Sequence, residues 1–331
     1  MRNKIAFEEH MAIADTVGQA EAFAKDGDHW DVFSRQIIDL GSERLETMDR
    51  NGIGYAILSL SAPGVQAILD TQEAIRIARK ANDVLAEAKA RHPKRYGAFA
   101  SVAMQDPDAA ARELTRCVRE LGFQGVMLNG FTQKDVPDSA LYYDLPEFDP
   151  FWAAVSELDV PVYLHPRMQI PARAQNYEGH TWMISAPWGF AVETSIHALR
   201  LCGSDIFEKY PNLRIVLGHL GENIPFGLER MNERMRFSRR GYRGKTLPGE
   251  NFARHFHCTT SGNFSDPSFR CTIDVMGADR VYFSSDFPFE PMEAGCAWFD
   301  ATDVVDDAEK ARIGRDNAIR LFNLPSDIGQ P

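Results

Sequence analysis

The feature that most constrains the fold of this chain is an alternation between short apolar runs and longer amphipathic segments. Eight runs rich in β-branched and aromatic residues alternate with helix-period segments, at residues 4–8, 55–60, 96–102, 125–129, 160–165, 214–219, 256–261 and 281–286. Because continuously apolar strands occur in parallel sheets that are covered by helices, this alternation predicts an α/β fold. Eight strand–helix units in 331 residues fit a closed (β/α)8 TIM barrel better than an open doubly wound sheet.

The segments between the runs predict the helices of this barrel. Helical periodicity covers residues 42–51, 71–90, 108–121, 148–158, 190–201, 225–238 and 267–276, and residues 307–322 predict two short C-terminal helices. Residues 11–40 and 131–149 do not fit the repeating unit. We expect them as insertions after the first and fourth strands, where barrels build lids and substrate walls. Since no repeat or linker interrupts the pattern, residues 1–331 are expected to form a single barrel domain.

Composition and charge argue against several classes of protein. The chain has 44% hydrophobic and 25% charged residues, which is typical of globular proteins and not of disordered, collagenous or coiled-coil chains. Its formal net charge of −11 argues against a nucleic-acid partner or an anionic membrane surface. Five scattered cysteines with no CxxC pair indicate a reducing compartment. With no secretory signal and no apolar span of membrane length, we expect a soluble, cytoplasmic protein.

Side chains that bind metals follow three of the apolar runs. Glu8 ends the first run and His10 follows it by two residues. His165 ends the fifth run and Asp286 ends the eighth. In a parallel barrel these strand ends meet at one mouth, where the active sites of such barrels lie, and the i, i+2 spacing directs Glu8 and His10 to the same side. Two imidazoles and two carboxylates suit Zn²⁺ or Mn²⁺. A lone histidine at a strand end is more often a hydrogen-bonded core residue, but four such residues together favour a metal site.

A second pair of residues lies at the end of the sixth run. His219 ends the run, and Glu222 follows three residues later, near the expected start of a helix. There the carboxylate can orient the imidazole, as acids behind functional histidines commonly do. The alternative is that Glu222 is only a helix-start residue favoured by the helix dipole.

These residues resemble those of the amidohydrolase superfamily, in particular the branch with aminocarboxymuconate-semialdehyde decarboxylase and the non-oxidative hydroxybenzoate decarboxylases. The resemblance covers essentially the whole chain and rests on residues 4–10 (KIAFEEH), 57–66 (ILSLSAPGVQ), 81–83 (AND), 142–144 (YYD), 164–167 (LHPR), 217–222 (LGHLGE), 259–264 (TTSGNF) and 285–290 (SDFPFE). Many amidohydrolases open with His-x-His, whereas Glu8-x-His10 favours decarboxylation over hydrolysis. The Glu-Glu-His opening favours the group acting on 2,6-dihydroxybenzoate, with 2,3-dihydroxybenzoate and salicylate as alternatives.

The resemblance implies a carboxy-lyase that removes CO₂ from an ortho-hydroxybenzoate, reversibly with excess bicarbonate. It implies one divalent metal ion (Mn²⁺ or Zn²⁺), acting as a Lewis acid, and no organic cofactor. The implied metal ligands are Glu8, His10, His165 and Asp286. Asp286 also protonates the ring carbon, and His219 with Glu222 holds or polarises the leaving carboxylate.

The family pattern further makes Asn129, Arg230 and Phe289 plausible contacts for the substrate, a small aromatic carboxylate, and Arg230 is placed to reach a neighbouring subunit's site. A turn asparagine, a solvated helix arginine and a core aromatic residue are the respective alternatives. Relatives of this architecture form dimers or tetramers, so a homo-oligomer is expected. A metal-dependent hydrolase of a lactone or amide, an aminocarboxymuconate-type decarboxylase and a barrel that only binds ligands remain as other interpretations.

Overall fold

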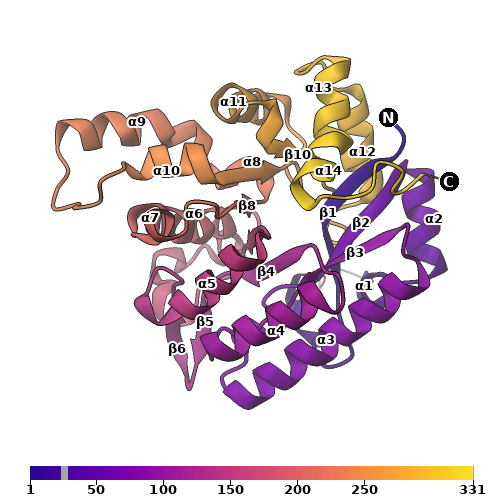
Figure 1. Ribbon diagram of the computed structural model, residues 1–331, viewed down its shortest axis with the longest axis horizontal. Helices are drawn as coiled ribbons and strands as arrows, with labels where there is room; N and C mark the ends of the chain where they lie inside the picture. The colour runs from indigo at the N-terminus through magenta and orange to yellow at the C-terminus, as the bar shows by residue number, and fades with distance from the viewer. Residues whose placement is uncertain (24–28, 331) are drawn as a thin grey trace.

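Eight parallel strands form the predicted barrel in the computed structural model, which describes residues 1–23 and 29–330 (Figure 1). The neighbour order is β1-β2-β3-β4-β7-β8-β9-β10. The strands are β1 Lys4–Met11, β2 Ile53–Leu60, β3 Tyr96–Ala100, β4 Gly125–Asn129, β7 Val162–His165, β8 Ile215–Leu217, β9 Phe256–Thr259 and β10 Val281–Tyr282. Two backbone hydrogen bonds close the seam between β1 and the segment after β10: Asp286 N donates to the Glu8 carbonyl at 3.0 Å, and His10 N donates to the Phe287 carbonyl at 2.8 Å. The (β/α)8 prediction is confirmed.

Helices surround the barrel, and every helix predicted between two strands is present within two residues of its expected bounds. The starts of α3 and α4 follow from local chemistry. The side chains of Asp70 and Asp106 accept hydrogen bonds from the backbone N–H groups of Glu73 and Ala109, in the first turns of these helices. The predicted tail forms two helices joined by the π-helical turn η8 (Arg312–Asp316). The helices are α1 Trp30–Ile38, α2 Ser42–Arg50, α3 Thr71–Arg91, α4 Pro107–Arg119, α5 Asp149–Leu158, α6 Gly189–Gly203, α7 Ile206–Lys209, α9 Ile224–Phe237, α10 Pro248–His255, α11 Asp266–Met276, α12 Met292–Ala301, α13 Asp307–Ala311 and α14 Asn317–Phe322.

Both expected insertions are present. After β1 the chain forms the 3-10 helix η1 (Val17–Phe23) and α1 before it reaches α2, and positions 24–28 of this insertion lie outside the described residues. After β4 an antiparallel hairpin, β5 (Thr132–Lys134) and β6 (Val136–Leu141), and the turn η3 (Pro146–Phe148) precede α5. The remaining 3-10 turns are η2 Gly64–Ala67, η4 Pro171–Arg173, η5 Gln175–Tyr177, η6 Thr181–Met183 and η7 Ala278–Arg280.

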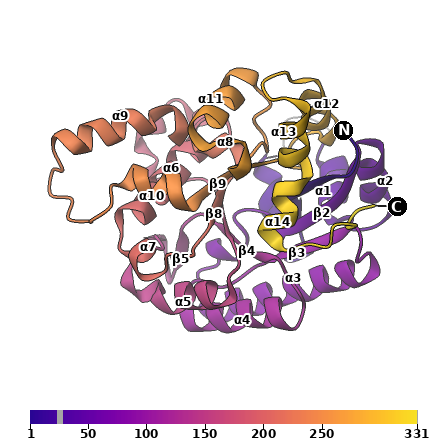
Figure 2. The same ribbon diagram turned by 45° about the horizontal axis from the view of Figure 1, so that its top comes forward.

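The C-terminal segment packs against one end of the barrel, where α14 lies beside the strands (Figure 2). The ring centroid of Phe322 lies 5.0 Å from that of Phe7 and 5.7 Å from that of Phe99. Apolar side chains from the other strands, among them Ile57 and Met127, complete this interior cluster. Burial of each such side chain contributes about 1.5–3 kcal/mol. This apolar cluster therefore fills the end of the barrel interior that lies opposite the predicted metal ligands.

Three further features complete the description of the fold. The pair α9 and α10 extends away from the barrel as an arm in both views (Figures 1 and 2). Within residues 1–23 and 29–330, no helix is both long enough and apolar enough to cross a bilayer. The five cysteines lie in this part of the chain and are free.

A β-bulge in β1 determines which of its side chains face the barrel interior. The register between β1 and β2 shifts just before Glu9, so Phe7 and Glu8 together oppose Ile57. A bulge of this kind re-aims the side chains that follow it. Phe7 and Glu8 therefore both face inward, His10 follows Glu8 at a spacing of two, and Glu9 faces the outer side of the barrel.

Candidate metal-centred active site

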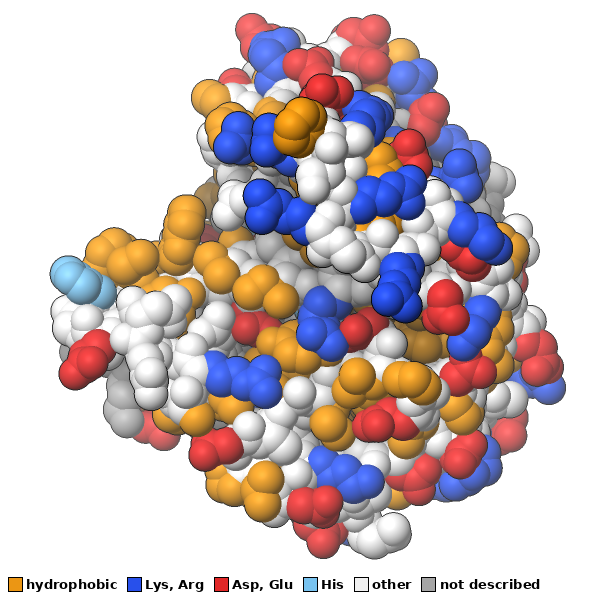
Figure 3. Space-filling model, turned by 90° about the vertical axis from the view of Figure 1, so that its left-hand side faces the viewer, with side chains coloured by type: hydrophobic (Ala, Val, Ile, Leu, Met, Phe, Trp, Pro, Cys, Tyr) orange, Lys and Arg blue, Asp and Glu red, His pale blue; other side chains and the backbone are white. Residues whose placement is uncertain are grey.

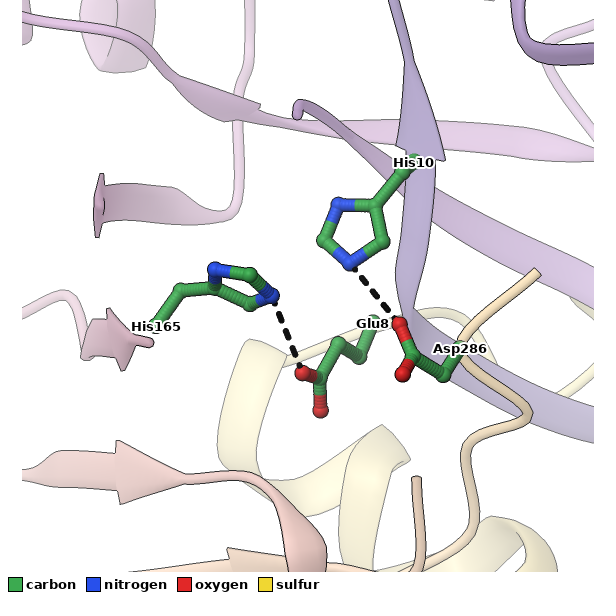
Figure 4. Close-up of side chains that lie close together, drawn as sticks. All are labelled: Glu8, His10, His165 and Asp286. Carbon is green, nitrogen blue, oxygen red and sulfur yellow. Dashed lines mark ion pairs between the residues drawn. The ribbon is translucent and has the colours of Figure 1, made fainter. Parts of the chain in front are cut away.

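The four predicted metal ligands converge in one place (Figure 4). One ligand atom from each of Glu8, His10, His165 and Asp286 lies within 4.8 Å of the others, and all four residues are buried. His165 Nε2 is 3.4 Å from Glu8 Oε1, and His10 Nε2 is 3.1 Å from Asp286 Oδ1. The strand bounds differ from the predicted runs, because β1 pairs with β2 as far as Met11 and β10 ends at Tyr282. Asp286 thus reaches the cluster from a loop.

The donor set of this cluster fits a divalent cation. Glu8 Oε1 and His10 Nε2 are buried, and neither makes a hydrogen bond of acceptable geometry within the described part of the chain. His165 Nδ1 lies 2.9 Å from the Pro166 carbonyl, which leaves the Nε2 lone pair facing the cluster. Burial holds the pKa of His165 well below its usual value, so the ring is neutral, as a metal ligand must be. Imidazole nitrogens with carboxylate oxygens can hold Mn²⁺ or Zn²⁺.

Three hydroxyl groups that the sequence analysis did not identify orient Glu8. The hydroxyls of Tyr163 and Ser261 donate hydrogen bonds to Glu8 Oε2, and Thr259 Oγ1 donates to the same oxygen at 3.1 Å. Burial nevertheless raises the pKa of the Glu8 carboxyl. A signal was present, since Tyr163 precedes His165 by two residues and Thr259 precedes Ser261 by two. This is the same spacing that placed Glu8 and His10 on one face.

The predicted pair of His219 and Glu222 forms beside the cluster. His219 Nδ1 is 2.7 Å from Glu222 Oε1, while His219 Nε2 is 3.6 Å from Asp286 Oδ2 and 3.8 Å from Glu8 Oε1. Burial alone lowers the pKa of His219, but the carboxylates of Glu222 and Glu8 outweigh burial and raise it well above its usual value. A positively charged imidazolium is therefore held next to the four candidate ligands.

An unusual backbone turn positions this pair. Residues 219–223 all have positive φ angles, of 53°, 59°, 89°, 56° and 66°, so the segment α8 (His219–Glu222) is not a regular helix. Only Gly221 among them lacks a Cβ atom, and each of the others costs about 1–2 kcal/mol in this conformation. Asp286 is also left-handed, with φ 67°. Strained residues of this kind cluster at functional sites, and here they carry His219 and Asp286, which lie 3.6 Å apart beside the candidate ligands.

A cavity of about 480 Å³ opens beside His219 and Asp286 and is also lined by Trp188, Asn263 and Glu290. This volume is within the range of small-molecule sites. Burial raises the pKa of Asp286, but the nearby imidazoles outweigh burial and hold it well below its usual value, whereas burial and the charge of Asp286 raise the pKa of Glu290. A larger cavity of about 860 Å³ lies at the amino-terminal end of β1 and β2, remote from these groups.

Comparison with known proteins identifies the family. A family model described as amidohydrolase matches residues 38–324. The chain belongs to the amidohydrolase family. The γ-resorcylate decarboxylase of Rhizobium radiobacter is 47% identical over 326 residues, which cover 98% of this chain and 99% of the relative. The resemblance predicted from the motifs is confirmed.

Solved structures agree with this family. A crystal structure of a 2,6-dihydroxybenzoate decarboxylase in complex with 2,6-dihydroxybenzoate has a TM-score of 0.95 at 46% identity, covering 98% of this chain and 100% of that one. The dihydroxybenzoic acid decarboxylase of Polaromonas sp. JS666, with bound manganese and the inhibitor 2-nitroresorcinol, has a TM-score of 0.95 at 44% identity, covering 98% of each chain.

In this amidohydrolase barrel the three predicted substrate contacts lie in different places. Asn129 ends β4 beside His165 of β7, and its Nδ2 donates to two backbone carbonyls. The Phe289 ring lies 5.4 Å from the His10 ring, so it borders the cluster. Arg230 is exposed on α9, in the projecting arm, and is not among the residues that line the cavity beside His219. Asn129 and Phe289 are thus close to the candidate ligands within one chain, and Arg230 is not.

Proposed function

We propose that this chain catalyses the metal-dependent, non-oxidative decarboxylation of an ortho-hydroxybenzoate, with 2,6-dihydroxybenzoate preferred over 2,3-dihydroxybenzoate and salicylate. The convergence of the four candidate ligands beside His219 carries this proposal, in a chain that is 47% identical over nearly its full length to a γ-resorcylate decarboxylase. The reaction is expected to run in reverse with excess bicarbonate. We expect Mn²⁺, which one relative's structure contains, with Zn²⁺ as the alternative.

The chemistry of the substrate sets what the site must supply. Loss of CO₂ from a benzoate would leave an aryl carbanion, so a proton must reach the ipso carbon before or during cleavage of the C–C bond. An ortho-hydroxyl donates electron density into the ring as that carbon accepts the proton, and for this reason no organic cofactor is required. A divalent ion held by Glu8, His10, His165 and Asp286 would supply a Lewis acid for the substrate.

Asp286 is the proposed proton shuttle. Its low pKa makes it a carboxylate in the free site, so it needs a donor, and the proton on His219 Nε2, 3.6 Å from Asp286 Oδ2, is at hand. Exclusion of water by a bound substrate disfavours both charged forms, because it raises the pKa of Asp286 and lowers that of His219, and this favours the transfer. Asp286 then protonates the ipso carbon, the electron pair of the C–C bond returns to the ring, and CO₂ leaves. Solvent restores one proton to His219 per turnover.

The second role of His219 concerns the leaving group. Before it gives up its proton, its imidazolium, held by Glu222 at 2.7 Å, is the proposed partner of the substrate carboxylate. Phe289 and Asn129 are proposed to contact the ring and one ring hydroxyl.

A homo-oligomer, a dimer or a tetramer, is proposed to complete the site with Arg230 from a neighbouring subunit. Two phenylalanines on the same helix support this proposal, because Phe226 is 89% and Phe237 is 79% exposed. The side of the molecule that Figure 3 shows carries hydrophobic side chains between lysines and arginines. Sedimentation of the purified protein tests the assembly, and a monomer at micromolar concentration would exclude it.

The substitution Asp286→Asn tests the proposed reaction. It keeps the shape of the side chain and removes the carboxyl that carries the proton, so turnover in both directions should fall by about 10²–10⁴-fold. The exposed Asp303→Asn is a matched control with unchanged activity. Substantial activity in Asp286→Asn would remove Asp286 from the role. Ring opening without CO₂ release would favour a lactone or amide hydrolase, and turnover of an aminocarboxymuconate alone would favour that branch.

A further inference from the structure

The outer side of β1 carries a buried acid between two candidate metal ligands. Glu8 and His10 face the barrel interior, whereas Glu9 faces outward and is only 1% exposed. It is not part of the candidate ligand cluster and does not line the cavity beside His219. The proposed reaction gives it no role.

Glu9 is bonded to the segment that carries the fourth candidate ligand. Its Oε1 accepts hydrogen bonds from Ser285 N at 2.9 Å and from Ser285 Oγ at 2.8 Å, and its Oε2 is also 2.8 Å from Ser285 Oγ. Ser285 directly precedes Asp286. The seam between β1 and this segment otherwise relies on a few bonds, such as Asp286 N to the Glu8 carbonyl. Glu9 therefore links β1 to the segment that carries Asp286.

A buried arginine holds the same seam from the α2 side. Arg44 is 2% exposed, and its NH2 donates to the His10 carbonyl at 2.7 Å and to the Gln36 carbonyl at 3.0 Å. Its guanidinium lies 5.1 Å from the ring centroid of Phe287, the residue after Asp286. Arg44 thus touches the backbone of one candidate ligand and the neighbour of another. Its charge lowers the pKa of the Glu9 carboxyl, although burial outweighs it and raises that pKa to about 7.

A contribution to stability does not by itself explain why Glu9 and Arg44 are buried at this seam. Removing a carboxyl and a guanidinium from water is costly, and buried charged groups can often be replaced together by apolar residues of similar volume without loss of stability. The hydrogen bonds of Glu9 and Arg44 have directions that an apolar pair would lack, and both side chains bind next to candidate ligands. Groups behind a metal ligand typically change metal affinity 10–100-fold when they are removed.

We infer that Glu9, together with Ser285 and Arg44, is a positioning residue that sets the separation between the ligands of β1 and Asp286, and thereby the affinity of the site for a divalent cation. This inference rests on the proposed metal site. It concerns residues that contact neither the cation nor the substrate.

The decisive variant separates positioning from stability. In Glu9→Leu/Arg44→Met both charges are replaced together, so no unpaired charge stays buried, and the thermal midpoint should remain near that of the wild type. Binding of Mn²⁺ to chelator-stripped protein, followed by the electron paramagnetic resonance of free Mn²⁺, should show a Kd about 10–100-fold higher. Glu9→Gln keeps an acceptor for Ser285 and should stay close to the wild-type Kd. Ser285→Ala, a milder change, should raise the Kd without unfolding the protein.

A matched pair on the outer helix α4 is the control. Glu113 and Arg116 form an ion pair at 2.7 Å, and Glu113→Leu/Arg116→Met should leave the Kd for Mn²⁺ unchanged. The inference is overturned if Glu9→Leu/Arg44→Met and Ser285→Ala bind Mn²⁺ as the wild type does, or if the α4 variant loses as much affinity. Wild-type protein that binds no Mn²⁺ would overturn the metal site and this inference together. Wild-type protein that binds Mn²⁺ without decarboxylating a hydroxybenzoate would overturn only the proposed substrate.

Discussion

The substitution Glu222→Gln tests the proposed role of His219 with an effect that the structure allows us to estimate. Glu222 Oε1 lies 2.7 Å from His219 Nδ1, and a hydrogen bond to a charged group is worth about 1.5–3 kcal/mol. Glutamine leaves a neutral hydrogen bond worth about 0.5–1.5 kcal/mol, so the variant loses about 1–1.5 kcal/mol. Since one pKa unit corresponds to about 1.36 kcal/mol, loss of the charge should lower the pKa of His219 by about 1 unit. Glutamine keeps the size of the side chain and an oxygen that accepts from Nδ1–H.

The assay is the pH profile of kcat/KM for 2,6-dihydroxybenzoate. If protonated His219 is required, activity is lost as the pH rises through its pKa, and Glu222→Gln should move this basic limb to lower pH by about 1 unit. Glu290→Gln is the control, because it removes a charge from the same cavity wall and should give a smaller shift. An unchanged basic limb in Glu222→Gln, or an equal shift in both variants, would refute the reasoning.

Three further predictions concern the metal site and stability. A Cβ at Gly218 would lie 2.7 Å and 2.9 Å from the Glu8 oxygens. Gly218→Ala should therefore cost about 1–3 kcal/mol of stability and raise the Kd for Mn²⁺ in a titration about tenfold. Gly227→Ala is the control and should change neither, because a Cβ there would have no described atom outside its own helix within 4 Å. Removal of the metal by a chelator should abolish activity and lower the thermal midpoint, and Mn²⁺ at 100 times its Kd should restore about 2.7 kcal/mol. Burial lowers the pKa of His197 to about 3, below its unfolded value, so stability is lost as the pH falls below about 6.5. By pH 5 this loss amounts to about 2 kcal/mol, which denaturant unfolding of His197→Gln should show as a weaker acid dependence.

The sequence was sufficient to predict the barrel and the convergence of the four candidate ligands because both depend on short-range periodicity. Strand–helix alternation predicts a parallel barrel, and the barrel brings strand ends together. His165 could therefore be placed beside Glu8 although 157 positions of the sequence separate them. The inward direction of Glu8 was right for an additional reason, since the bulge opposite Ile57 re-aims the side chains that follow Phe7.

Features that depend on register or on unusual backbone angles could not be predicted. The left-handed turn at residues 219–223 contains a single glycine, so only Gly221 gave a local signal. The contact of Glu9 with Ser285 joins residues 276 positions apart and follows from where the barrel closes. Arg230 lies on the projecting arm, which another chain would cover in the proposed oligomer, so its surroundings depend on residues outside this chain.

This amidohydrolase is proposed to be a metal-dependent hydroxybenzoate decarboxylase. The most direct test incubates purified protein of known metal content with 2,6-dihydroxybenzoate while resorcinol and CO₂ are followed, with 2,3-dihydroxybenzoate and salicylate in parallel. We expect equal amounts of resorcinol and CO₂ from 2,6-dihydroxybenzoate, loss of activity with a chelator and recovery with Mn²⁺. Fully metallated protein that converts none of the three acids, or that converts one without releasing CO₂, would contradict the claim.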